Sequence, residues 1–242
     1  GDIRDHAKLS KTILVSKPDV VIHMAAQPLV RYSYAQPAET YEVNVMGTIY
    51  LLEAVRASPS VKAVVNVTSD KCYENQERIQ GYSENEAMGG IDPYSSSKGC
   101  AELVTSAYRQ SFFEPAGIAL ASARAGNVIG GGDWAADRLI PDFFRSLKNN
   151  AAIVVRNPLS VRPWQHVLEP ISGYMMLAER MAQPNGKNYV GSWNFGPIGN
   201  PISVEEVTKK LLGFAGVQNF VIDTNVGPKE TNLLILVFDV LD

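Results

Sequence analysis

Tyr94 and Lys98 are the two residues whose types and spacing point most directly to chemistry. They stand four positions apart near the start of a helix expected over 92–113, so their side chains share one helix face. A lysine ammonium close to a phenol favours the phenolate and lowers a pKa that is ordinarily about 10. Such a phenol can take a proton from a sugar hydroxyl while a hydride leaves the same carbon. The alternative is a surface tyrosine and lysine without a shared role.

A second polar group, Ser69, Asp70 and Lys71, follows a strand expected over 61–67. Ligands of open parallel sheets bind outside the carboxyl ends of the strands, which is where these side chains fall. Ser69 can hydrogen-bond a substrate hydroxyl, Asp70 can act as an acid if its pKa is raised, and Lys71 as a base if burial lowers its pKa. Adjacent residues of a straight strand point to opposite faces, so Asp70 and Lys71 serve one site only if the strand has ended. The alternative is an ion pair in a solvated turn.

The glycine-rich segment 126–132 follows a third expected strand, 117–123. A dinucleotide phosphate loop would open the first strand–helix unit and precede an acidic residue by about 20 positions. This segment follows the third strand instead, and Asp133 and Trp134 interrupt the expected helix start. We therefore interpret it as a backbone turn that lines a pocket, in which Asn127 can donate to a phosphate or a nucleotide.

Three arginines in the second half of the chain, Arg138, Arg156 and Arg162, have side chains suited to bidentate phosphate recognition. The alternative for any one of them is a solvated surface position. His23, inside an expected strand, is interpreted as a core histidine, and His166 as structural. No Cys/His group has the spacing of a zinc site, so no metal is expected.

The elements that must position these residues alternate between strand and helix. The strands are expected at 18–26, 61–67 and 117–123, and the helices at 7–15, 37–58 and 92–113. Continuous apolar strands between helices predict an α/β fold, a Rossmann-like doubly wound parallel sheet with right-handed crossovers. Beyond about 130 the elements shorten: helices at 137–149, 170–182 and 203–214, and strands near 152–155, 165–168 and 192–195. We expect a Rossmann-type domain over 1–130 and a smaller substrate-binding lobe over 131–242, with the apolar tail 232–242 as a buried strand.

Composition excludes several classes of protein. With 242 residues, 45% of them hydrophobic and 19% charged, the chain is neither disordered nor fibrous. A net charge of −3 without a basic run disfavours nucleic acid and anionic membranes as partners. Two scattered cysteines suit a reducing cytoplasm. No apolar run is long enough to span a bilayer, and the first residues lack the apolar core of a signal peptide.

Taken together, the motifs resemble those of the extended short-chain dehydrogenase/reductases, and within them the nucleotide-sugar 4,6-dehydratases. The segments that carry the resemblance, in the family's order, are His23-Met24-Ala25-Ala26-Gln27, Asn44-Val45-x-Gly47-Thr48, Thr68-Ser69-Asp70-Lys71, Tyr94-x-x-x-Lys98 and Arg124-x-x-Asn127-Val128-x-Gly130. Segments 68–75, 126–134 and 162–167 are most similar to family members that act on CDP-glucose. Related dehydratases carry Glu where this chain has Lys71.

The resemblance implies an NAD-dependent lyase that removes one water from a nucleotide hexose. By residue-to-residue match its catalytic residues are Ser69, Asp70, Lys71, Tyr94 and Lys98. Tyr94 takes the hydroxyl proton while the C4 hydride passes to NAD, and Lys98 holds the nicotinamide ribose. Lys71 then removes the C5 proton, Asp70 protonates the leaving C6 hydroxyl, and the hydride returns to C6.

The resemblance also implies binding residues and a partner. Asp2 and Ile3 flank the adenine of NAD, Ala25, Ala26 and Gln27 line the cofactor with Tyr94 and Lys98, and Asn44 supports the site. Arg31, Asn127, Arg138 and Arg162 hold the nucleotide diphosphate. The helices at 37–58 and 92–113 pair across a dimer axis in this family, which implies a homodimer.

Two stretches depart from the family's pattern. The family's opening strand and Gly-x-x-Gly-x-x-Gly turn have no counterpart before Asp2, and 231–242 does not match the usual continuation. We therefore expect an internal fragment of a longer protein. The alternatives to a dehydratase that acts on CDP-glucose are another nucleotide-sugar dehydratase, a 4-epimerase of the same family, or a nucleotide-binding fragment without catalysis.

Overall fold

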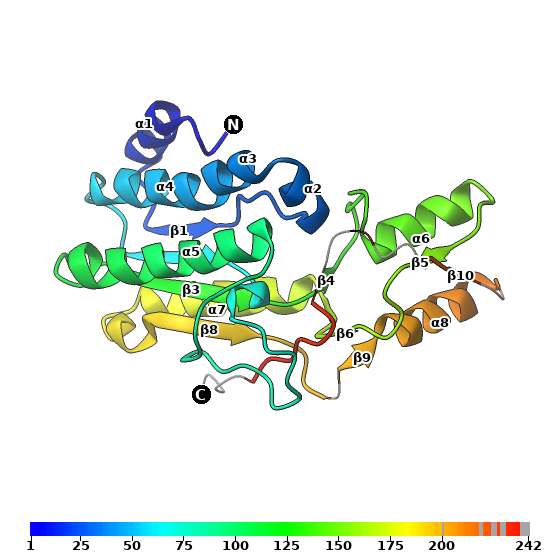
Figure 1. Cartoon of the computed structure of the whole chain (residues 1–242). Helices are drawn as coiled ribbons and strands as arrows, with labels where there is room; N and C mark the ends of the chain where they lie inside the picture. The colour runs from blue at the N-terminus through cyan, green and yellow to red at the C-terminus, as the bar shows by residue number, and fades with distance from the viewer. Residues whose placement is uncertain (200, 218–219, 224–226, 228–230, 238–242) are drawn as a thin grey trace.

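The main sheet of the molecule is parallel and carries the site at the ends of its strands. The computed structural model describes residues 1–199, 201–217, 220–223, 227 and 231–237. Its four-stranded sheet has the order β1 (Val20–His23), β2 (Ala63–Val67), β3 (Ala119–Ala125) and β8 (Gly191–Phe195), with every neighbouring pair parallel (Figure 1). The α/β fold with a parallel sheet is therefore confirmed.

Helices cover both faces of this sheet. Alternate residues of β2 point to opposite sides, so Val64 packs with α1 (His6–Ser16) and α4 (Gly47–Arg56), while Val65 packs with α7 (Leu168–Met181). Burying one such aliphatic side chain contributes roughly 1.5–3 kcal/mol. The doubly wound arrangement follows from this two-sided apolar strand.

The strand β1 is less buried than its apolar sequence predicts. Val21 and His23 are buried, but Ile22 is 37% exposed and Met24, which follows the strand, is 54% exposed. The prediction of a strand buried on both faces is wrong here, because α7 packs mainly on β2 and β3 and leaves that face of β1 partly open.

The long helices that flank the site contain wider turns. The helix expected over 37–58 consists of α3 (Pro37–Tyr41), a π-helical turn η1 (Glu42–Met46) and α4. The second consists of α5 (Pro93–Tyr108) and the π-helical turn η3 (Arg109–Phe113). Asp92 caps α5, accepting from Ser95 N at 2.9 Å, as its sequence predicts. Such π turns are frequent at functional sites, and η1 turns Asn44 inward.

Short elements form a second lobe beside the carboxyl ends of the strands (Figure 1). It contains α6 (Leu139–Lys148), α8 (Val204–Ala215) and the two-stranded pairs β5 (Val154–Val155)–β10 (Val221–Ile222), β4 (Val128–Ile129)–β7 (Gln165–His166) and β6 (Val161–Arg162)–β9 (Ile202–Ser203). Phe143, Ile153, Val155 and Leu212 form its core. The remaining short helices are α2 (Val30–Ala35), η2 (Asp70–Cys72) and η4 (Gly186–Tyr189).

Two segments of the second half differ from expectation. The prediction that the strand near 192–195 belongs to the smaller lobe is wrong, because β8 pairs with β3 in the main sheet. In the tail, Leu233 and Leu236 form isolated bridges to Val161 and Tyr82 instead of a continuous strand. Leu234 and Leu236 are buried, and the part of the expected strand at 238–242 lies outside the described residues. No helix in the described part of the chain is long and apolar enough to cross a bilayer.

Candidate active site

The turn after β2 brings Ser69, Asp70 and Lys71 to one place. β2 ends at Val67, and 70–72 form the 3-10 turn η2, which Ser69 caps by accepting from Lys71 N at 3.2 Å. Ser69 Oγ also donates to Asp70 Oδ1 at 3.0 Å. Because the strand has ended, Asp70 and Lys71 both line the same cavity. The condition that the sequence sets for a shared site is met.

Asp70 has the environment of a general acid. Its side chain is buried, and its Oδ2 has no hydrogen-bond partner among the described residues. Burial raises the pKa of this carboxyl above its usual range, against the opposing effects of the Lys71 charge, the Ser69 hydrogen bond and the Arg162 charge. A carboxyl whose protonated form is favoured in this way can deliver a proton to a leaving hydroxyl.

Tyr94 contacts the same turn from α5. Its phenol is hydrogen-bonded to Ser69, and its backbone N donates to Ser33 Oγ at 3.1 Å. Burial raises the pKa of Tyr94 to about 12, while the Ser69 hydrogen bond and the Arg138 charge act in the opposite direction. The expected lowering is therefore wrong for the chain alone, because the loss of solvent outweighs the positive charges nearby.

Lys98 is a buried cation that fits a cofactor hydroxyl. It is 5% exposed and forms no ion pair with any described residue, although fully buried lysines are ordinarily paired. Burial lowers its pKa to about 8, and the Glu102 charge opposes that shift. An ammonium without a carboxylate partner beside Tyr94 suits the ribose hydroxyls of the expected NAD.

The cofactor residues predicted after β1 lie along the same edge. Ala25 is exposed and Ala26 half-buried, whereas Gln27 is buried. Asn44 accepts from Gln27 N at 2.8 Å and donates to Gln27 O at 3.1 Å and to Ser97 Oγ at 2.8 Å. Asn44 thus ties the turn after β1 to α5, which is the supporting role expected for it.

Asp2 and Ile3 lie before α1, away from the cavity lining. Asp2 is exposed and pairs with Arg4 at 2.7 Å, while Arg4 also lies 3.4 Å from Glu39 of α3. Ile3 packs against Gly47, where an added Cβ would lie 2.7 Å from its side chain. The structure leaves their expected contact with the adenine as a prediction.

The predicted catalytic turn and the predicted substrate residues share one cavity of about 340 Å³ between the main sheet and the second lobe. The predicted residues that line it are Arg31, Ser69, Asp70, Lys71, Tyr94, Asn127, Arg138 and Arg162. Gly126 allows the turn after β3 to approach Pro163 and Asp70 closely, because an added Cβ would lie 2.3 Å from Pro163 Cγ and 3.1 Å from Asp70 Oδ2. The segment after β3 therefore lines a pocket, as the sequence favours. We call Ser69, Asp70, Lys71 and Tyr94 the reacting end of this cavity.

The other end of the cavity holds arginines paired with carboxylates. Arg156 Nη1 lies 2.7 Å from Asp137 Oδ1, and Arg31 Nε lies 3.9 Å from the same oxygen. Arg138 Nη1 lies 2.8 Å from Asp133 Oδ2. We call Arg31, Arg138 and Arg156 the arginine end. Unlike them, Arg162 is buried, and it donates to the backbone oxygens of Val161, Thr231 and Asn232.

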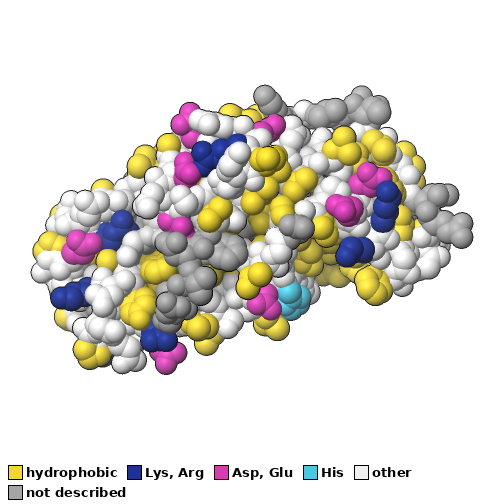
Figure 2. All heavy atoms as spheres, turned by 90° about the horizontal axis from the view of Figure 1, so that it is seen from below, with side chains coloured by type: hydrophobic (Ala, Val, Ile, Leu, Met, Phe, Trp, Pro, Cys, Tyr) yellow, Lys and Arg dark blue, Asp and Glu magenta, His cyan; other side chains and the backbone are white. Residues whose placement is uncertain are grey.

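Three residues that line the cavity are absent from the predicted site: Asp133, Asp137 and Trp164. Arg156, which the sequence indicates as suited to phosphate, lines it as well. The density of Arg and Trp over 156–164 is a usable signal for Trp164, but nothing in the sequence pairs Asp137 with Arg156. Opposite charges lie side by side in the same way on the face seen from below, where the coloured side chains form no basic patch (Figure 2).

The histidines take no part in the cavity. His23 is buried with Nε2 3.1 Å from Thr48 Oγ1, and burial together with the Lys98 charge lowers its pKa to about 4. His166 is exposed, and its Nδ1 accepts from Leu168 N at 3.3 Å. Within the described ranges, no three His, Cys, Asp or Glu side chains are grouped to hold a metal ion.

Comparison with known proteins agrees with this geometry. Residues 1–212 match the family model described as GDP-mannose 4,6 dehydratase. CDP-glucose 4,6-dehydratase of Salmonella typhimurium is 56% identical over 98% of this chain and 67% of the relative. A dTDP-D-glucose 4,6-dehydratase of Dictyostelium discoideum is 32% identical over 89% of this chain and 49% of the relative.

Solved structures share the fold. A double mutant of DesIV, a dTDP-glucose 4,6-dehydratase from Streptomyces venezuelae with NAD and DAU bound, superimposes with a TM-score of 0.82 at 25% identity, over 98% of this chain and 70% of that chain. A UDP-glucose 4-epimerase of Thermus thermophilus, in complex with NAD, also gives 0.82 at 22% identity, over 98% and 75% of the two chains. The match over 1–212 and the 56% identity show that this chain belongs to the GDP-mannose 4,6 dehydratase family.

Proposed function

We propose that this chain carries the active site of an NAD-dependent nucleotide-sugar 4,6-dehydratase that acts on CDP-glucose and yields CDP-4-dehydro-6-deoxyglucose. The single observation that carries the proposal is the reacting end of the cavity. A buried carboxyl with a raised pKa, a lysine and a tyrosine meet there. Identity of 56% with a CDP-glucose 4,6-dehydratase supports the choice of substrate. The chain spans 67% of that relative and about half of the Dictyostelium one.

The reaction begins with removal of a proton and a hydride from C4 of the sugar. Tyr94 accepts the proton of the C4 hydroxyl, and Ser69, bonded to the phenol, orients that hydroxyl. Lys98 would hold the nicotinamide ribose of NAD, which when bound would supply the acceptor for the C4 hydride and its donor to C6. The positive charge of Arg138 favours the phenolate of Tyr94.

Loss of water then follows across C5 and C6. The C4 ketone acidifies the C5 proton, which passes to Lys71 when its amine is uncharged. The electron pair of the C5–H bond forms the C5–C6 double bond, and the C6 oxygen leaves with the proton of Asp70 as water. The protonated Lys71 returns its proton to C5 when hydride reaches C6. Burial raises the pKa of the Asp70 carboxyl and so favours the protonated form that this step requires.

The arginine end, together with Arg162, supplies positive charge for a nucleotide diphosphate. Arg31, Arg138 and Arg162 line the cavity with Asn127, and bidentate arginine contacts suit phosphate oxygens. The same residues favour a nucleotide sugar over an uncharged sugar, because only the former brings anions to this end.

Assembly, domain division and location form part of the proposal. A homodimer through α4 and α5 is supported by Leu103 and Phe112, which are 61% and 41% exposed on that side of the molecule.

We divide the chain near 130 into a Rossmann-type domain and a nucleotide-sugar lobe, with α7 and β8 returning to the former. The free thiols of Cys72 and Cys100 suit the cytoplasm.

The test is a mass measurement on the purified chain with NAD and a panel of CDP-, dTDP-, GDP- and UDP-linked glucose or mannose. Loss of one water from the CDP-linked sugar is the expected result. A product of unchanged mass that separates from the substrate by chromatography would favour a 4-epimerase, which needs Tyr94 and Lys98 but no Asp70–Lys71 pair. Binding of NAD without any change in the sugar would mean that this chain binds nucleotides without catalysis.

A further inference from the structure

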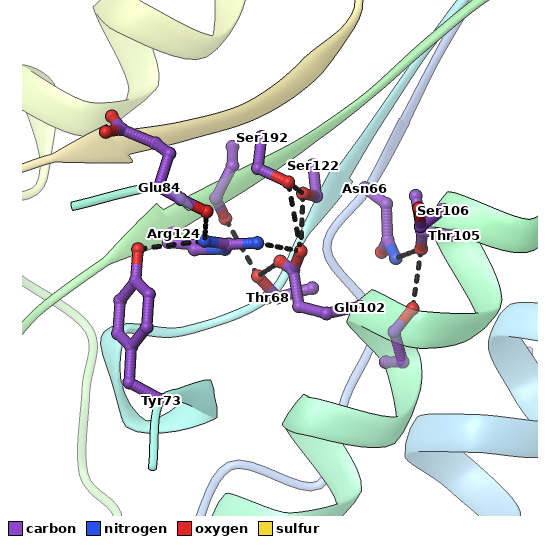
Figure 3. A network of polar contacts seen from close by, with 12 residues as sticks. Asn66, Thr68, Tyr73, Glu84, Glu102, Thr105, Ser106, Ser122, Arg124 and Ser192 are labelled. Atoms are coloured by element: carbon purple, nitrogen blue, oxygen red, sulfur yellow. Dashed lines mark hydrogen bonds and ion pairs between the residues drawn. The ribbon is translucent and has the colours of Figure 1, made fainter. Parts of the chain in front are cut away.

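A buried ion pair between Glu102 of α5 and Arg124 of β3 forms the centre of a network of polar contacts (Figure 3). Glu102 Oε2 lies 2.6 Å from Arg124 Nη2, and the two side chains are 3% and 4% exposed. The same carboxylate accepts from Thr68 Oγ1 and, at 2.7 Å, from Ser122 Oγ. Ser192 Oγ of β8 adds a longer contact of 3.4 Å.

Glu102 and two of its partners, Thr68 and Arg124, lie next to segments that carry site residues. Glu102 lies on α5 one turn beyond Lys98, and Thr68 immediately precedes Ser69. Arg124 is the penultimate residue of β3, just before the pocket-lining turn. Its guanidinium donates to Tyr73 Oη at 2.9 Å, directly after the turn that holds Lys71.

The energetics argue against a purely stabilising role. Removing two charges from water costs several kcal/mol for each ion, so a buried pair is weak support for stability compared with apolar packing. What the pair does provide is fixed geometry, since a carboxylate with four polar contacts can occupy only one position. That geometry sets the distance between α5 and the turn after β2.

We propose that Glu102 is a positioning residue, which holds the oxidising half of the site, Tyr94 and Lys98, in register with the eliminating half, Ser69 to Lys71. The inference rests on the proposed function, because only a reaction with two chemical steps needs both halves at a fixed distance from one sugar. Glu102 itself is absent from the cavity lining.

The test is Glu102→Gln, which keeps the size and one acceptor but removes the charge. A misplacement of about 1 Å costs up to about 100-fold in rate, so we expect kcat to fall by about 10- to 100-fold with KM nearly unchanged. Because the two halves are no longer held at the right distance, elimination becomes slower than oxidation. Enzyme-bound NADH should therefore accumulate during turnover, which is measured as an increase in its absorbance. Thr68→Val, which leaves the ion pair intact, should show the same pattern at smaller size.

The matched control is Thr105→Val. Thr105 is as buried as Glu102 and also joins α5 to β2, accepting from Asn66 Nδ2 at 2.7 Å, but one turn farther from the site. We expect it to lower stability without accumulation of NADH. If Glu102→Gln and Thr105→Val behave alike once corrected for the folded fraction, the inference is wrong.

Amide hydrogen exchange tests the role of Glu102 separately from the proposed function, because the measurement does not require the chain to be catalytically active. Glu102→Gln should speed exchange of the amides over 68–73, and Thr105→Val should leave them unchanged. Faster exchange in a chain without dehydratase activity would overturn the proposed function and leave Glu102 as the residue that fixes this turn. Unchanged exchange over 68–73 in Glu102→Gln would overturn the inference, whatever the activity.

Discussion

The reacting end and the arginine end of the cavity hold their charged groups in opposite ways. At the reacting end, Asp70 and Tyr94 are buried, and burial is the largest cause of their pKa shifts. At the arginine end, Arg138 and Arg156 keep 36% and 28% of their side chains exposed and are paired with carboxylates of the loop before α6. One end is preorganised by exclusion of water, and the other by ion pairs that a ligand can replace.

The difference predicts where substitutions act. Electrostatic effects grow when water is excluded, so changes at the reacting end should alter rates by orders of magnitude. Exposed ion pairs contribute about 0–1 kcal/mol, so changes at the arginine end should alter affinity by small factors. The predictions below test this contrast, beginning with the largest effect.

Tyr94→Phe should remove turnover almost completely. The variant keeps the ring in its buried site but has no group to accept the C4 hydroxyl proton, a role worth about 100- to 10,000-fold. We expect kcat to fall by that factor and KM to change little, as measured by product formation from CDP-glucose. A variant that retains full activity would remove Tyr94 from the mechanism.

Lys71→Met should separate the two halves of the reaction. Tyr94 and Lys98 remain, so oxidation at C4 proceeds, whereas removal of the C5 proton is slowed by about 100-fold or more. NADH absorbance should therefore rise to a plateau in a single turnover, with no water lost from the sugar. Normal water loss in this variant would mean that another group is the base.

Sequence patterns predict the parts of this site that are local. Tyr94 and Lys98 share a helix face, and Ser69 to Lys71 follow a strand, so short spacing alone brings each set together. The parallel sheet follows equally from the alternation of apolar strands with helices. The direction of the Tyr94 pKa is not local, because it depends on how completely the second lobe and α2 exclude water.

The contacts that sequence patterns do not predict depend on how strands far apart in the sequence pair with one another. Glu102 meets Thr68, Ser122 and Ser192 only because β2, β3 and β8 are adjacent in a fixed register. β8 itself follows the whole second lobe, so its return to the main sheet has no local signal. The pairing of Asp137 with Arg156 depends on a left-handed backbone at Asp137, φ +63°, which composition does not specify.

The buried Lys98 should give the chain a distinctive dependence of stability on pH. Its pKa is lowered from 10.5 to about 8 by burial, so between these values the unfolded chain binds a proton that the folded chain has lost. The contribution of Lys98 to the free energy of unfolding therefore rises with pH across that interval. Urea unfolding of the wild type and Lys98→Met across this range should show a difference between the two that grows in favour of the wild type as pH rises, since the other groups titrate in both. Parallel curves would contradict the burial of Lys98.

Asp137→Asn should produce the smallest effect and test the arginine end. The substitution frees Arg156 and Arg31 from a carboxylate that a substrate diphosphate must otherwise displace. Because an exposed pair is worth about 0–1 kcal/mol, we expect KM for CDP-glucose to fall by about 2- to 5-fold with kcat unchanged. The fall in KM should become smaller as salt is added, since screening weakens the competing pair and the diphosphate contact alike.

The control is Asp19→Asn, which breaks another exposed pair, Asp19–Lys62 at 2.7 Å, outside the cavity, and should leave KM unchanged. A raised KM in Asp137→Asn would instead show that Asp137 holds the arginines in the position that the diphosphate needs, so that this end is preorganised as strictly as the reacting end.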